Sequence, residues 1–173
     1  MKKATVLAVL ILALALSACG KKDEPPQTGN PWREITEAEA KEICPASFRM
    51  PEGAQNAQWT VLESAADPSG VPGPLVQLSF DLDGNRFHAR EQVTGDSAID
   101  QSGMYYEWTA QLDGALRTWN DLPCVCYRFI GDEGYADLCT WYDADAGVSY
   151  SVSVTAEDLD GFDLQAIAEF MHP

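Results

Sequence analysis

The chain has 173 residues, of which 46% are hydrophobic and 22% are charged. This length and apolar content suit one folded domain and exclude a disordered acidic tail. The net charge of -16 repels a phosphate backbone, so we expect no nucleic-acid partner.

Residues 1–18 have the pattern of a secretory signal peptide. A basic start precedes an uncharged run over residues 4–18, which is shorter than the about 20 apolar residues of a membrane-spanning helix. The run leads into Leu16-Ser17-Ala18-Cys19, which resembles the lipobox of bacterial lipoproteins. The resemblance implies that Cys19 is joined to diacylglycerol and becomes the first mature residue. The alternative is an ordinary signal peptide with an unmodified cysteine.

A lipidated Cys19 would anchor the protein to a membrane without spanning it, because several acyl chains together hold a protein firmly. Residues 19–31 then form a lipidated flexible tether, since the stretch after Cys19 is polar and rich in Pro and Gly. Gly20 replaces the Asp that keeps lipoproteins of that family on an inner membrane, and the number of membranes stays open. We expect a single extracytoplasmic domain over residues 32–173, at the cell membrane or the outer membrane. Its acidic surface should stand off anionic lipid.

Helices are expected near both ends of this domain. Thr36 and Glu39 form a capping box at the start of a helix over residues 35–44. A closing helix places four apolar residues on one face by their spacing, with Asp160 or Asp163 as its cap. Those four are Leu164, Ile167, Ala168 and Met171.

The pattern between the helices has period two, which is typical of β-strands. Residues 59–63 predict one strand, and the turn-rich insert 65–74 follows it. Residues 104–112 alternate in the same way and predict a strand that ends in a turn at Asp113-Gly114.

The Asp83-Gly84 pair is the strongest hairpin signal of the chain. A two-residue turn there joins strands 75–82 and 85–94 and sets Phe80 opposite Phe87. It also sets Asp81 opposite Arg86, so that apolar meets apolar and acid meets base.

Three further strands are predicted over residues 124–130, 135–142 and 148–154. The first turn sets Arg128 opposite Asp137 and Tyr127 opposite Leu138. A five-residue loop over 143–147 then sets Leu138 opposite Val152. One core face is therefore expected to hold Val125, Tyr127, Phe129, Leu138, Tyr150, Val152 and Val154. The domain is predicted to be α+β, an antiparallel sheet of about seven short strands with a short helix at each end.

The last part of the chain also resembles a known group of domains. Trp141, Gly147 and Tyr150, followed by a helix with Ile167-Ala168, are similar to uncharacterised extracytoplasmic domains of bacterial lipoproteins and anti-sigma-like membrane proteins. The resemblance implies a surface domain and carries over no active site.

Catalytic and metal-binding signals are weak. The acidic turns at 81–85, 143–147 and 158–163 lack the spacing of an EF-hand calcium loop and suit tight turns instead. His88 is expected on the outward face of its strand, and His172, next to the chain end, is expected on the surface. We expect no cofactor, and a hydrolase with dispersed carboxylates stays an alternative.

The aromatic residues favour a half-buried sheet over a carbohydrate site. Tyr106 and Trp108 alternate with Met104, which predicts that they point into the core. Trp141 and Tyr135 lie on the other face from Tyr127, and burial under the first helix is favoured over exposure.

Four cysteines remain once Cys19 is lipidated, and outside a membrane disulfides can persist. The predicted register sets Cys126 opposite Cys139, so we expect that disulfide, which leaves Cys44 to bond Cys124. Zinc binding by these four is disfavoured, because Cys-x-Cys on a strand lacks the Cys-x-x-Cys turn. Four free thiols are the alternative.

These observations predict a lipid-anchored, non-catalytic domain of the cell envelope that binds a protein, peptide or other ligand. A hydrolase and a structural accessory of a surface complex are the alternatives.

Overall fold

The computed structural model describes residues 31–63, 73–132 and 134–173. The predicted signal peptide, Cys19, the tether up to residue 30 and most of the 65–74 insert lie outside the described residues. No helix in the described part is long and apolar enough to cross a membrane.

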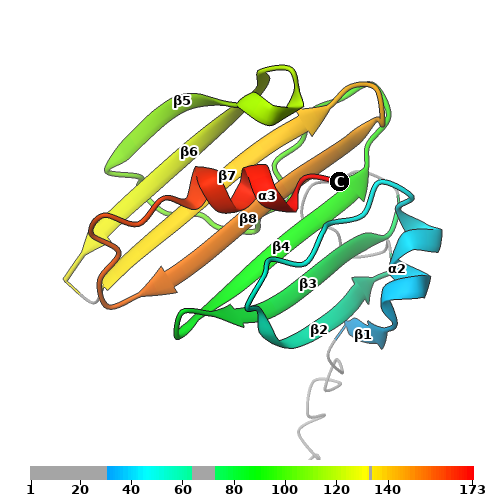
Figure 1. Ribbon diagram of the computed structural model, residues 1–173, viewed down its shortest axis with the longest axis horizontal. Coiled ribbons are helices and arrows are strands. Elements are labelled where there is room, and N and C mark those ends of the chain that lie inside the picture. Colours follow the sequence, from blue (N-terminus) through cyan, green and yellow to red (C-terminus); the bar gives the residue numbers. More distant parts are fainter. Residues whose placement is uncertain (1–30, 64–72, 133) are drawn as a thin grey trace, which may run out of the picture.

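The described chain forms one eight-stranded antiparallel sheet with two α-helices (Figure 1). In chain order the elements are β1 (Trp32–Ile35), α2 (Glu37–Ile43), β2 (Gln55–Leu62), β3 (Leu75–Leu82), β4 (Asn85–Val93), β5 (Ala110–Leu116), a 3-10 turn η1 (Arg117–Trp119), β6 (Leu122–Gly131), β7 (Gly134–Asp143), β8 (Val148–Ala156) and α3 (Leu164–Met171). The strand order β1-β2-β3-β4-β8-β7-β6-β5 makes two four-stranded meanders that meet where β4 pairs with β8. An α+β fold with an antiparallel sheet is therefore confirmed, with eight strands instead of about seven.

Both helices begin with side-chain caps. Thr36 Oγ1 accepts the N–H of Glu39, and the Glu39 carboxylate accepts the N–H of Thr36, so the predicted capping box is confirmed. Asp163 Oδ1 accepts the N–H of Ala166 and caps α3. Figure 1 shows α3 lying across the middle of the sheet, while α2 lies beside the first meander.

The hairpin of β3 and β4 has the predicted register. Phe80 faces Phe87, and Asp81 faces Arg86. Asp83 and Gly84 both have positive φ, 50° and 82°, which is the backbone of a type I′ turn.

The hairpin of β7 and β8 corrects the predicted core face. Asp143 pairs with Val148, so the loop has four residues rather than five, and Leu138 faces Ser153 instead of Val152. Asp143 Oδ1 accepts the N–H groups of Asp145 and Ala146, so this residue both pairs in the ladder and closes the turn.

A one-residue slip exchanges the two faces of a strand. The prediction of which β6 and β7 residues share a sheet face with the core residues of β8 was therefore wrong. Tyr150, Val152 and Val154 do line the core, but four of the expected core residues lie on the outer face of the sheet. These four are Val125, Tyr127, Phe129 and Leu138.

Only the end of the strand predicted over residues 104–112 is a strand, because β5 begins at Ala110, and the turn predicted after it was wrong. Asp113 and Gly114 lie within β5, opposite Val125 and Cys124, and not in a turn. The chain turns later, where Asn120 and Asp121 adopt positive φ of 58° and 55°. A glycine can occupy a turn or a strand position where another group approaches closely. Gly114 has the second role, because Gln165 and Cys124 lie close to it.

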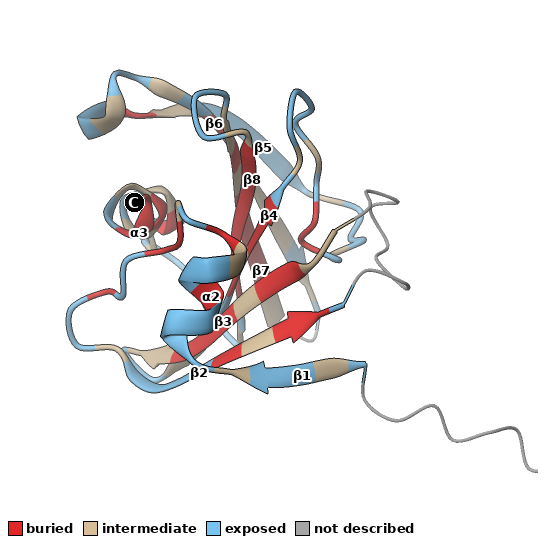
Figure 2. Cartoon of the chain, turned by 90° about the vertical axis from the view of Figure 1, so that its right-hand side faces the viewer, coloured by how far each residue is buried: buried red, intermediate tan, exposed pale blue. Residues whose placement is uncertain are grey.

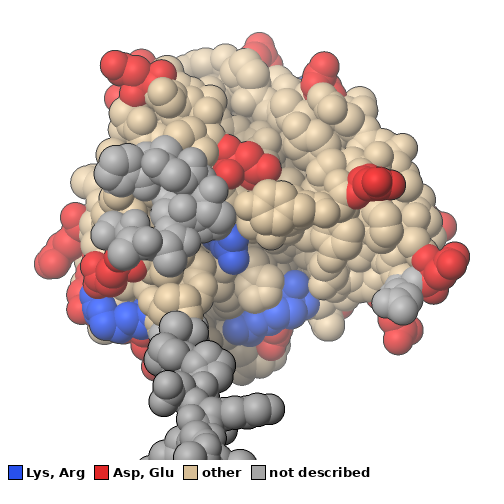
Figure 3. All heavy atoms as spheres, turned by 180° about the vertical axis from the view of Figure 1, so that it is seen from behind, with Lys and Arg blue, Asp and Glu red and all other residues tan. Residues whose placement is uncertain are grey.

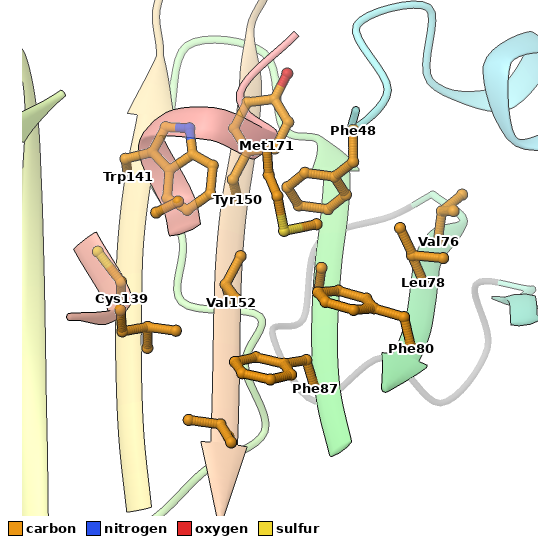
Figure 4. Packing of buried hydrophobic residues seen from close by; sticks show 14 of the residues in the cluster. Phe48, Val76, Leu78, Phe80, Phe87, Cys139, Trp141, Tyr150, Val152 and Met171 are labelled. Carbon is orange, nitrogen blue, oxygen red and sulfur yellow. The ribbon is translucent and has the colours of Figure 1, made fainter. Parts of the chain in front are cut away.

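Three rows of side chains cross the inner face of the sheet. This is the face that α3 covers (Figure 2), and Figure 4 shows some of its buried side chains from close by. The first row is Phe80, Phe87, Val154, Asp137 and Arg128; the second is Trp59, Leu78, Ala89, Val152, Cys139 and Cys126; the third is Val61, Val76, Glu91, Tyr150, Trp141 and Cys124. The rows begin apolar in the first meander and end in charges or thiols in the second. The chemistry of the core therefore changes along the sheet.

Candidate functional site

Three cysteines of the second meander meet on the inner face. The Sγ atoms of Cys124, Cys126 and Cys139 all lie within 4.8 Å of one another. Cys126 faces Cys139 across β6 and β7, and Cys124 precedes Cys126 by two residues on the same strand face. Cys124 and Cys139 are buried, and Cys126 is half-buried. We call these three residues the thiol cluster.

The backbone brings Cys126 and Cys139 close together. The N–H of Thr109 donates to the carbonyl of Arg128, so the backbone groups of Arg128 point toward β5 and away from β7. Cys126 lies two residues earlier and shares this direction, so it forms a non-hydrogen-bonded pair with Cys139, in which Cα atoms are about 4.5 Å apart. That spacing suits the predicted disulfide. The four described cysteines are free, and the Cys126–Cys139 bond stays a prediction.

Gly114 and α3 enclose the buried side of the thiol cluster. Gly114 lies opposite Cys124, and a Cβ there would stand 3.1 Å from Cys124 Sγ and collide with Gln165 Oε1. Gln165, on α3, donates from Nε2 to the carbonyl of Ala115 at 2.8 Å. The missing side chain of Gly114 thus makes room for both the sulfur and the helix.

A pocket of about 300 Å³ opens beside the thiol cluster, between β5, β6 and the start of α3. Its wall includes Cys126, Asp163 and the ion pair of Arg128 with Asp137. The guanidinium donates from Nε and Nη2 to the two carboxylate oxygens at 2.8 and 2.5 Å. Solvent in the pocket can therefore reach Cys126, and the neighbouring charges of Arg128 and Asp137 are paired with each other.

Hydrogen bonds within the thiol cluster favour the loss of one proton. The S–H groups of Cys126 and Cys139 donate to Cys124 and lower the pKa of that thiol. The same bonds, and then burial, raise the pKa of Cys126 and of Cys139. One thiolate can therefore be shared among three sulfurs, and the remaining protons leave when a cation takes their place.

Cys44 lies apart from the thiol cluster, beside Glu91. Burial raises the pKa of Cys44 to about 12, helped by the charge of Glu91. Glu91 accepts from Ser47 Oγ at 2.6 Å and from the N–H of Phe48 at 2.9 Å. Since β8 and β7 separate Glu91 from Cys124, this arrangement disfavours the Cys44–Cys124 bond, which stays a prediction.

The two histidines differ in burial, since His88 is exposed and His172 is buried. His88 lies on the outward face as expected, with Nδ1 2.9 Å from Ser79 Oγ. The surface position expected for His172 was wrong, because its side chain is buried and its Nδ1 accepts the indole N–H of Trp141 at 3.1 Å. The end of the chain is held inward by the carbonyl of Met171, which accepts the N–H of Arg49.

The burial favoured for Trp141 is confirmed, whereas the core position expected for Tyr106 was wrong. Trp141 is buried, stacked on Tyr150 with ring centroids 5.2 Å apart. Its cover is the segment after α2, through Phe48, rather than α2 itself (Figure 4). Tyr106 was expected in the core but stacks on Phe129 on the outer face, where it is 40% exposed.

The acidic turns support the turn interpretation. Asp143 and Asp158 each accept backbone N–H groups of their own turns. Their side chains thus have the local role that the residue types predicted.

Comparison of the chain with protein-family models, curated proteins and solved structures finds no match. The function must therefore be argued from the site itself. The thiol cluster was missed in the sequence because metal binding was judged by the Cys-x-x-Cys spacing along one strand and not by which sulfurs meet across two strands. The predicted pairing of Cys126 with Cys139 was the available signal, because it places the sulfur of Cys139 beside those of Cys124 and Cys126.

Proposed function

We propose that this protein is a lipid-anchored domain outside the membrane that binds a ligand without catalysing a reaction. Cys19 carries the lipid and residues 20–31 form the tether. The observation that carries the binding role is the pocket of about 300 Å³ that leads to the thiol cluster. This volume lies at the small end of ligand pockets.

Internal contacts of the acid–base groups support binding rather than catalysis. His88 contacts Ser79, and His172 accepts from an indole N–H. Glu91 and Asp137 each accept hydrogen bonds from two groups or atoms of the domain itself. A general base needs a free lone pair within reach of a substrate, and these four groups hold the fold together instead.

The surface charge supports a domain that stands off the bilayer. The chain has 27 acidic and 11 basic residues. In the view from behind, acidic side chains are scattered over the outline and the face (Figure 3). Anionic headgroups repel such a surface, so a tether is needed to keep the domain near the membrane.

The anchor is tested by labelling cells with an alkyne fatty acid. We expect the unmodified protein to take up the label and the Cys19→Ala variant to lose both the label and its membrane association. Cys44→Ala is the matched control, because it removes a cysteine that the proposal leaves unlipidated, and it should keep the label. A labelled, membrane-bound Cys19→Ala variant would overturn the anchor.

One labelling experiment tests both the location and the pocket. A membrane-impermeant maleimide is added to unlysed cells after any outer barrier has been permeabilised and disulfides have been reduced. We expect Cys126, which borders the pocket, to react before the buried Cys44. Labelling of Cys126 only after cell lysis would contradict an extracytoplasmic domain. Equal rates at the two cysteines would contradict a pocket that is open only beside Cys126.

A further inference from the structure

We propose that Cys124, Cys126 and Cys139 bind a single thiophilic metal ion, and that monovalent copper is the ion they suit. This inference names the ligand of the site described above and rests on the proposal that the domain binds one. It concerns three side chains from two adjacent strands, held under a helix.

The spacing of the sulfurs suits a shared ion. A metal–sulfur bond of about 2.3 Å places the sulfurs of a three- or four-coordinate site about 4 Å apart. The three Sγ atoms already lie within 4.8 Å of one another. Movements of less than about 1 Å, within the reach of side-chain rotation, would complete the site.

The surroundings hold this spacing in place. Cys126 and Cys139 belong to paired strands in the middle of the second meander, and Cys124 lies two residues from Cys126 on β6. Gly114 leaves the space into which Cys124 Sγ projects, and Gln165 of α3 closes it. A preorganised donor set lowers the ordering cost of binding.

The number and kind of donors select the ion. Thiolates are soft ligands that prefer monovalent copper and zinc over magnesium, calcium or manganese. Among the described His, Cys, Asp and Glu residues the group has three members and no fourth. Structural zinc sites have four protein ligands, and zinc held by three protein ligands needs a water in the fourth position, whereas monovalent copper is satisfied by three sulfurs. Of the two acids of the pocket wall, Asp137 is paired with Arg128, and Asp163 uses one carboxylate oxygen to cap α3.

The binding step balances as an exchange of protons for the ion. From the fully protonated thiol cluster, three S–H bonds break, three copper–sulfur bonds form, three protons pass to solvent, and no electron is transferred; a sulfur that is already a thiolate releases no proton. Affinity should therefore rise with pH. Oxidation of Cys126 and Cys139 to a disulfide by a two-electron oxidant would remove two of the three donors, so only the reduced protein should bind.

The test uses the full-length chain, purified in detergent, reduced and kept free of oxygen. Monovalent copper is supplied through a chelator that competes for it, and zinc is tested in a separate arm with its own chelator. We expect one copper per chain. Cys124→Ser, Cys126→Ser and Cys139→Ser should each weaken binding by more than the roughly 10–100-fold that loss of an outer-shell partner costs.

Cys44→Ser is the matched control, because Cys44 is equally buried but lies outside the thiol cluster, and it should bind like the unmodified chain. X-ray absorption of the copper-loaded unmodified protein gives an answer even where a serine variant fails to fold, and we expect three sulfur neighbours. Copper bound through fewer sulfurs, or equal loss in Cys44→Ser, would overturn the site.

Two further outcomes are decisive. No copper binding by the reduced protein would overturn the inference while leaving a lipidated, ligand-binding domain in place. Zinc bound by the same three sulfurs, with copper rejected, would overturn the choice of ion. Loss of the lipid label with copper binding intact would overturn the anchor alone, so the two proposals fail separately.

Discussion

The two meanders share one antiparallel backbone pattern but fill the inner face differently. In the first row of the core, Phe80 and Phe87 of the first meander stack with ring centroids 5.2 Å apart. The same row ends in the second meander with Arg128 and Asp137. Both meanders bury apolar side chains, and the first also buries Glu91, but only the second sets a charge pair and thiols beside a pocket. Both meanders therefore stabilise the fold, and the second alone combines thiols with a pocket.

The largest loss of stability should come from a core residue of the first meander. Phe80 is fully buried, so Phe80→Ala removes a large side chain and leaves a cavity, at a cost of about 3–5 kcal/mol in the free energy of unfolding. Leu112 of the second meander is 66% exposed, and Leu112→Ala should change stability by less than about 0.5 kcal/mol. Urea denaturation measures both. Similar losses in the two variants would contradict the assignment of Phe80 to the core and of Leu112 to the surface.

Glu91 should make stability depend on pH. Burial raises the pKa of this carboxyl from 4.5 to about 8, so the folded state holds a proton that the unfolded state releases above about pH 4.5. The contribution of Glu91 to stability is therefore complete below pH 4.5 and falls as the pH rises toward 8, by roughly 4 kcal/mol. Glu91→Gln should abolish this fall, as measured by urea denaturation across the pH range. Glu52→Gln, at an exposed position, is the control and should keep it.

The Arg–Asp pairs of the two hairpins allow a direct comparison. Asp137 is nearly buried, with a side-chain exposure of 6%, whereas that of Asp81 is 37%. Asp137→Asn should cost about 2 kcal/mol, because the half-buried guanidinium of Arg128 loses its charged partner. Asp81→Asn should leave the free energy of unfolding nearly unchanged, since water screens the exposed pair. Chemical denaturation of both variants would contradict this contrast if the two losses were equal.

The helix caps should give the smallest effects on stability. Thr36→Ala and Asp163→Ala each remove a cap worth about 1 kcal/mol. They should differ in what they uncover, because α3 and not α2 covers the thiol cluster. We expect Asp163→Ala, but not Thr36→Ala, to speed the alkylation of Cys126, as measured by mass spectrometry. Equal acceleration by Thr36→Ala would show that the cluster opens only through global unfolding.

Local residue chemistry was enough to predict much of the first meander. The Asp83-Gly84 turn leaves one favourable register, in which Phe80 meets Phe87, and the structure has it. The capping box at Thr36 likewise depends on residues three apart in the chain. Such features are decided by neighbours in sequence, so they can be read without the rest of the fold.

The second meander needed tertiary information, for two physical reasons. Asp143 can end a strand or pair within it, and that single choice moved Leu138 from the inner face to the outer face. Gly114 can form a turn or admit a close neighbour, and only the presence of Cys124 and α3 decides between them. The thiol cluster is a consequence of both pairing and packing, since it joins residues of two strands under a helix from the end of the chain. Composition and motif predicted a tethered acidic α+β domain, whereas the place where three sulfurs meet depended on contacts between residues far apart in sequence.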